Sequence, residues 1–193
     1  MTAHSRGAEA AFDSGPALRA LRADYDAQAG RSLSLPIAGA AVWAVVGLGG
    51  LLLAERTATF LLLFGTGAIF PVALGLSRVL RERVLDNANP LAKLMALSVL
   101  MVNLLWALHL TLVIDAPQFV PLTIGIGLGL HWVVFAWVIG HRVGLVHAVL
   151  RTALVSAAWW FLPDWRVSAV AGAVIVAYAY SIATLSRRSP NLA

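Results

Sequence analysis

Six long apolar stretches follow one another along this chain, and nearly all of its charged residues lie between them. Each stretch reaches the length of about 20 residues that a helix needs to cross a hydrocarbon core roughly 30 Å thick. The chain is 60% hydrophobic and only 12% charged, which is far less charge than a soluble domain usually carries. The pattern therefore predicts a polytopic integral membrane protein.

The apolar stretches are continuous, whereas the strands of a transmembrane β-barrel alternate between apolar and polar residues. Helices also satisfy every backbone polar group within one segment, as lipid requires. The predicted fold is therefore all-α, a membrane bundle of six transmembrane helices. We place the spans at Pro36–Ala54, Ala58–Leu76, Leu94–Ile114, Phe119–Ile139, Leu145–Pro163 and Val167–Leu185.

The positive charges predict the orientation of this bundle. Of the 14 Lys and Arg residues, only Arg56 and Arg166 fall in the loops on one side, and Arg151 falls within a span. Since loops rich in Lys and Arg stay in the cytoplasm, both termini should be cytoplasmic. The first span begins too far along the chain for a cleavable signal. We expect a bacterial cytoplasmic (inner) membrane protein whose net charge of +5 reflects orientation in the lipid bilayer, with no nucleic-acid partner.

The chain divides into three predicted regions. Residues 1–34 form a cytoplasmic arm, residues 35–186 form the six-helix transmembrane domain, and residues 187–193 form a cytoplasmic tail. In the arm, Ser14-Gly15-Pro16 predicts a helix start, and an interfacial helix and a solvated arm are both compatible with this segment. We expect the second span to continue as an amphipathic stalk until Asn89 caps, and Pro90 opens, the third span.

The interior of the predicted bundle contains no carboxylate, because every Asp and Glu lies in the N-terminal arm or the loops. This argues against cation channels and proton-coupled transporters, which commonly use intramembrane acids. The absence of Cys excludes disulfides and thiolate metal ligands. The polar residues that remain within or beside the spans give four candidate ligand-binding residues, Asn103, His131, His147 and Arg151.

Helix geometry places these candidates at similar depth. His131 lies roughly 12 Å, and Arg151 roughly 9 Å, from the cytoplasmic end of its span. His147 and Arg151 are four residues apart and share one helix face, and small residues beside Asn103 favour its burial. Purely structural roles remain alternatives: Asn103 as an interhelical hydrogen bond, Arg151 reaching the lipid phosphates, and His131 as a packing histidine.

Two classes of function stay open at this point, and the absence of enzyme motifs favours a protein that is not an enzyme. The first is a small-solute transporter or permease, for which a buried Arg and neutral His favour an anionic or polar solute. The second is a scaffold, sensor or assembly factor that acts through helix faces, including homo-oligomers, as stripes of small residues such as Gly125 and Gly129 suggest. A haem protein with paired histidines is a third alternative, weakened by the different depths of His109 and His131; no cofactor is predicted.

One segment carries a family resemblance. The run from Gly127 to Phe135, read GLGLHWVVF, continues through Gly140-His141-Arg142 to His147 and Arg151. Together with Phe70-Pro71-Val72 and Asn89-Pro90-Leu91, it resembles an uncharacterised bacterial family of small multi-pass membrane proteins. The resemblance implies no activity, and it directs attention to the histidines and arginines of this segment.

Overall fold

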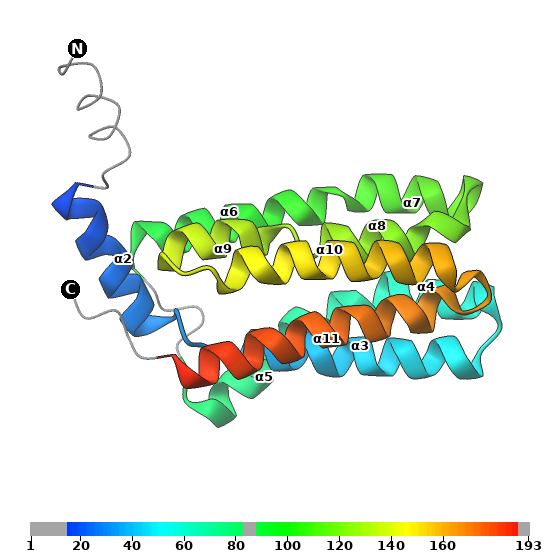
Figure 1. Cartoon of the computed structure of the whole chain (residues 1–193), viewed down its shortest axis with the longest axis horizontal. Coiled ribbons are helices and arrows are strands. Elements are labelled where there is room, and N and C mark those ends of the chain that lie inside the picture. The colour runs from blue at the N-terminus through cyan, green and yellow to red at the C-terminus, as the bar shows by residue number, and fades with distance from the viewer. Residues whose placement is uncertain (1–14, 83–87, 189–193) are drawn as a thin grey trace, which may run out of the picture.

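The computed structural model describes residues 15–82 and 88–188, and every regular element within them is a helix. Six segments of this part of the chain are long and apolar enough to cross a membrane, as predicted. They run side by side along the longest axis of the molecule (Figure 1). Spans 1 to 6 are Ser34–Leu52, Glu55–Leu80, Pro90–Asp115, Pro117–Ile139, Val143–Phe161 and Pro163–Arg187.

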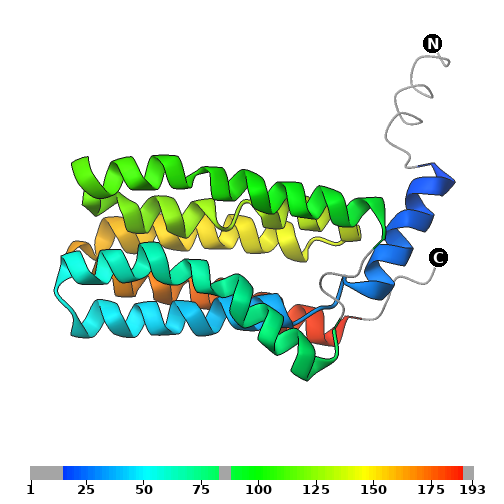
Figure 2. The same cartoon turned by 180° about the vertical axis from the view of Figure 1, so that it is seen from behind.

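Four of the six spans contain an interruption or begin with a short 3-10 turn. Spans 1 and 5 are single helices, α3 (Ser34–Leu52) and α10 (Val143–Phe161). Span 2 consists of α4 (Glu55–Gly65), η1 (Thr66–Ala68) and α5 (Ile69–Leu80), and span 3 consists of α6 (Pro90–Leu104) and α7 (Trp106–Asp115). Span 4 consists of η2 (Pro117–Phe119), α8 (Val120–Gly127) and α9 (His131–Ile139). Span 6 consists of η3 (Pro163–Trp165) and α11 (Arg166–Arg187). Figure 2 shows span 2 bending away from the bundle where α4 passes into α5.

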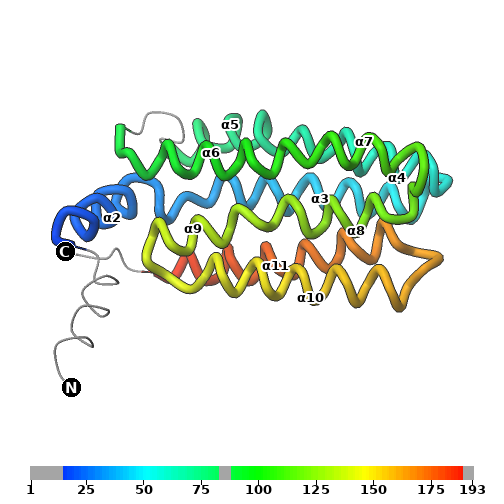
Figure 3. Tube along the Cα trace, turned by 90° about the horizontal axis from the view of Figure 1, so that it is seen from above, coloured from blue at the N-terminus to red at the C-terminus, as the bar shows by residue number. Residues whose placement is uncertain are grey.

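The bundle is built around α11, which packs against α3 on one side and α10 on the other. Figure 3 shows α3, α8 and α9 between α10 and α11 below and the α6–α7 span above. Small residues allow the close approach of α3 to α11: a Cβ at Gly39 would collide with the ring of Tyr178, and one at Gly50 would collide with the backbone of Ser168. These glycines therefore serve contacts within the chain.

The helix predicted after Ser14 is present as α2 (Pro16–Gln28), and it lies across one end of the bundle (Figures 1 and 2). We call this the α2 end. Asn89 attaches α2 to the bundle, since its Nδ2 donates to the carbonyl oxygen of Leu21 at 2.8 Å. The Oδ1 of the same side chain accepts from the backbone N–H of Leu91 at 2.8 Å. The predicted cap of the third span, with Pro90 as its first helical residue, is thus confirmed.

The stalk that the sequence predicted beyond the second span stops early. Helix α5 ends at Leu80, because Arg81 adopts the left-handed conformation with φ of 56°. The carboxylate of Glu82 then turns back to the start of α3, where it accepts hydrogen bonds from the backbone N–H groups of Leu33 (2.8 Å) and Ser34 (3.1 Å). Glu82 therefore caps the start of α3 and does not continue α5. The rest of the expected stalk, residues 83–87, lies outside the described residues.

Candidate functional site

Arg151 is the central feature of the bundle interior. It is fully buried, with 0% of its side chain exposed, on the middle of α10. Its Nε–H donates to the carbonyl oxygen of Gly125 at 2.5 Å, and its Cζ lies 5.4 Å from the ring of Trp43 and 5.5 Å from that of Tyr178. The Tyr178 phenol lies near the guanidinium, yet Nη1 and Nη2 make no hydrogen bond of normal geometry with any described residue.

The carbonyl that Arg151 contacts belongs to a break in span 4. Helix α8 ends at Gly127 and α9 begins at His131, so the span is two half-helices joined by three turn residues. The N–H of Gly129 bonds to Ile126 at 2.8 Å, whereas in an unbroken helix it would bond to Gly125. Gly129 must also be small, because a Cβ there would lie 2.7 Å from Cδ of Arg151. The arginine thus supplies a donor to the Gly125 carbonyl, which has lost its helical partner at the break.

His147 lies one turn before Arg151 on α10 and is completely buried. Its ring stacks on Trp132 with centroids 4.0 Å apart, and its Nδ1 lies 2.7 Å from Oγ of Ser181 on α11. Its other ring nitrogen, Nε2, has no hydrogen-bond partner among the described residues. The close packing of α10 against α9 depends on Gly144, because a Cβ at that position would collide with the backbone of Trp132.

His131 is the first residue of α9, and its Nδ1 is buried without a hydrogen-bond partner in the described part of the chain. Its ring lies close enough to Arg151 and to His147 to interact electrostatically with both side chains. The structure therefore brings His131, His147 and Arg151 together, on two adjacent spans, around the break in span 4. Together they present several buried nitrogen atoms and no carboxylate.

Asn103 does not join this cluster, and the burial that the sequence favoured for it is wrong. The residue is exposed on α6, and its Nδ2 donates to the carbonyl oxygen of Val99, one turn earlier, at 2.8 Å. The physical reason is the peripheral place of span 3: only 17% of its most apolar window is buried in the structure, compared with 39% in span 4. Small neighbours on a helix face do not reveal whether that face meets protein or lipid.

The cluster also contains residues that sequence reasoning did not assign to it, namely Trp43, Trp132, Tyr178 and Ser181. Trp43 and Tyr178 lie in the middle of their spans, whereas membrane Trp and Tyr residues concentrate at the interfaces; that mid-span position was the available signal. Ser181 lies on α11, and its hydroxyl contacts His147.

His109 forms a separate polar contact. Its side chain is only 2% exposed, and its Nδ1 lies 3.2 Å from Oγ1 of Thr123 on α8. Among the described residues, no group of three or more His, Asp or Glu side chains is placed to hold a metal ion.

The fold and this interior cluster define a small six-span membrane protein with a buried arginine at a helix break. A family model described as a family of unknown function, DUF7010, matches residues 18–188 of the chain. The chain belongs to this family. No curated protein and no solved structure matches it.

Proposed function

We propose that this protein is a small membrane permease that binds an anionic small solute at Arg151. The observation that carries the proposal is the fully buried guanidinium whose Nη1 and Nη2 have no hydrogen-bond partner among the described residues. A buried cation with unused donors is costly in an apolar interior. Arginines at membrane depth commonly mark a substrate or ion pathway for this reason.

The chemistry of the surroundings favours an anion as the missing partner. The acids of the six spans occur only at or near their ends, as Glu55, Asp115 and Asp164. The rings of Trp43 and Tyr178 stabilise the cation through their π-systems but offer no negative charge. The planar fork of a guanidinium matches a carboxylate or phosphate oxygen pair, which defines the class of solute.

The break in span 4 favours a transport role over a purely structural role for the buried arginine. Discontinuous helices line the binding sites of many transporters, where the half-helix ends face the solute. In this structure Gly129 packs directly against Cδ and Nε of Arg151 and leaves no room there for a Cβ. We propose that α8 and α9 move relative to each other to admit the solute, with the three turn residues between them as the hinge.

The orientation of the permease is part of the same proposal. The α2 end carries most of the basic residues, and the positive-inside rule then places it in the cytoplasm. In this orientation α2 and the C-terminal end of α11 both lie on the cytoplasmic side of the membrane.

The experiment is a transport measurement on proteoliposomes. Currents on a solid-supported membrane are recorded while the wild-type protein is exposed to inorganic anions, small carboxylates and phosphate. We expect a current with at least one of these anions, loss of that current in Arg151→Met, and no loss in the control Arg166→Met, whose guanidinium packs on Trp159 at the far end of the bundle. Equal currents in wild type and Arg151→Met would contradict the proposal.

A further inference from the structure

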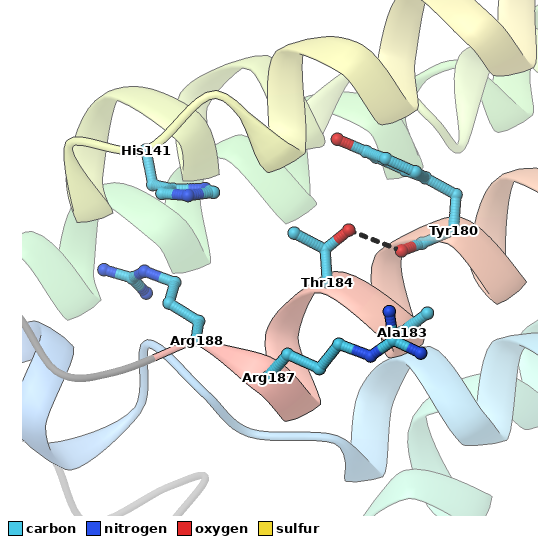
Figure 4. Close-up of a pocket in the computed structure, with 6 residues that line it drawn as sticks. All are labelled: His141, Tyr180, Ala183, Thr184, Arg187 and Arg188. Carbon is cyan, nitrogen blue, oxygen red and sulfur yellow. Dashed lines mark hydrogen bonds between the residues drawn. The ribbon is translucent and has the colours of Figure 1, made fainter.

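A second polar region lies at the α2 end, away from Arg151. It is an open cleft of about 450 Å³ between the end of α11 and the turn that joins α9 to α10. Figure 4 shows His141 on one wall of the cleft and Arg188 rising toward it from the other. The lining residues are His141, Tyr180, Ala183, Thr184, Arg187 and Arg188.

Arg188 is held in place by the N-terminal segment. Its Nη1 donates to Oδ1 of Asp26 at 2.6 Å and to the carbonyl oxygen of Gly30 at 3.3 Å. The side chain of Arg188 is only 5% exposed, and that of Asp26 only 1%. Its Nε and Nη2 have no hydrogen-bond partner among the described residues. These two nitrogens form one edge of the planar guanidinium, and such an edge binds two oxygens of an anion at once.

The other walls of the cleft add positive charge and donors. Arg187 is exposed at its rim. The Nδ1 of His141 accepts from the backbone N–H of Val143 at 3.1 Å, so a neutral ring carries its proton on Nε2 and can donate to a ligand. Burial, followed by the charges of Arg188 and Arg142, lowers the pKa of His141. Asp26 is the acid that faces Arg188, and its contact with Nη1 leaves the Nε–Nη2 edge unused.

We propose that this cleft binds a phosphate group, as carried by the headgroup of an anionic phospholipid. The cleft lies at the end of two membrane spans, where phospholipid headgroups are located. Clusters of Arg beside the ends of membrane helices recognise such headgroups, and paired arginines favour phosphate because of their fixed donor geometry. This proposal is independent of the permease function, because none of its residues belongs to the cluster around Arg151.

The test measures lipid binding directly. The full-length protein in detergent is titrated with phosphatidylglycerol and, separately, with phosphatidylcholine of the same acyl chains, and bound lipid is counted by native mass spectrometry. Arg187→Gln/Arg188→Lys removes both forked donors and keeps a charge beside Asp26. We expect it to bind phosphatidylglycerol at least tenfold more weakly than wild type, since each lost hydrogen bond to a charged group costs about this much or more. The control is Arg142→Gln, which removes one charge from the same end outside the cleft.

Two further arms keep the proposal falsifiable. Arg187→Gln/Tyr180→Phe leaves the Asp26–Arg188 pair intact and tests the cleft if the first variant does not fold. Inorganic phosphate is added as a competitor: displacement of phosphatidylglycerol shows that the phosphate group itself is recognised, and stabilisation by inorganic phosphate in the absence of lipid indicates a soluble phosphate ester as the source. Unchanged phosphatidylglycerol binding in the cleft variants, or equal loss in Arg142→Gln, would overturn the proposal.

Discussion

Arg151 on α10 donates its Nε–H to the backbone carbonyl of Gly125 on α8, at 2.5 Å, across the point where span 4 breaks. The break frees this carbonyl, because the N–H of Gly129 bonds to Ile126 instead. A carbonyl exposed by a helix break within a membrane needs a donor, and the arginine supplies it. The break and the buried cation are therefore one structural unit, and disturbing either should disturb the other.

Gly129→Ala tests this coupling. An added Cβ would lie 2.7 Å from Cδ and 3.0 Å from Nε of Arg151, so the guanidinium must leave the Gly125 carbonyl. We expect a loss of about 1–3 kcal/mol in unfolding free energy, as for other overpacked interiors, measured by denaturant unfolding in detergent. Gly172→Ala is the matched control, because a Cβ there meets no atom within 4 Å. An equal effect of both changes would argue against the coupling.

Ser181→Ala removes the hydroxyl that contacts Nδ1 of His147. The variant leaves Nδ1 of this buried histidine without its hydroxyl partner on α11, which lies at 2.7 Å. The expected loss of stability is about 1–3 kcal/mol. Ser98→Ala provides the comparison: Ser98 is also buried, but among the described residues its hydroxyl bonds to the carbonyl of Met95 in its own helix. If Ser181→Ala changes the unfolding free energy no more than Ser98→Ala does, the hydrogen bond to His147 does not stabilise the protein.

The stability of the folded protein should depend on pH through the carboxyl group of Glu82. Burial raises the pKa of its carboxyl, but hydrogen bonds from Ser32, Leu33 and Ser34 outweigh burial and hold the pKa below its ordinary value of 4.5. The stabilisation is therefore present above pH 4.5 and is lost as the pH falls through the lower folded-state pKa. Glu82→Gln should be less stable than wild type at neutral pH, and thermal unfolding should show the difference shrinking in acid. A difference that is constant with pH would contradict this. Glu55→Gln, at the other end of the bundle, is the control.

The absence of Cys makes the orientation directly measurable. Gln28 and Gln118 are both exposed and lie at opposite ends of the bundle, so Gln28→Cys and Gln118→Cys form a matched pair. With the α2 end in the cytoplasm, a membrane-impermeant maleimide added to intact cells should label the cysteine at position 118 and spare the one at position 28 until the cells are lysed. The reverse pattern would refute the proposed orientation.

The number of spans could be predicted from the sequence because long apolar runs separated by charges leave few alternatives. The cap at Asn89 was also predictable, since Asn-Pro before an apolar run is a local signal. The end of α5 was not, because it depends on Glu82 reaching α3, a contact between residues far apart in the chain.

The interior cluster was predictable only in part. The spacing of His147 and Arg151 on one helix is a local property and was correct. Asn103 looked equally suited to burial, yet its helix lies at the edge of the bundle, and local sequence does not encode which spans pack at the edge. Trp43 and Tyr178 join the cluster through the packing of α3 and α10 on either side of α11, which depends on tertiary structure.

The most direct test of the central claim compares the thermal stability of wild type and Arg151→Met in detergent, with and without a panel of inorganic anions, carboxylates and phosphate. Without anions, Arg151→Met should differ from wild type by no more than about 3 kcal/mol, because removal of an unpaired buried charge offsets the loss of the donor to the Gly125 carbonyl. At least one anion should raise the unfolding temperature of wild type and not that of the variant. If every anion shifts both proteins equally, Arg151 has only a structural role and the anion-binding account is wrong.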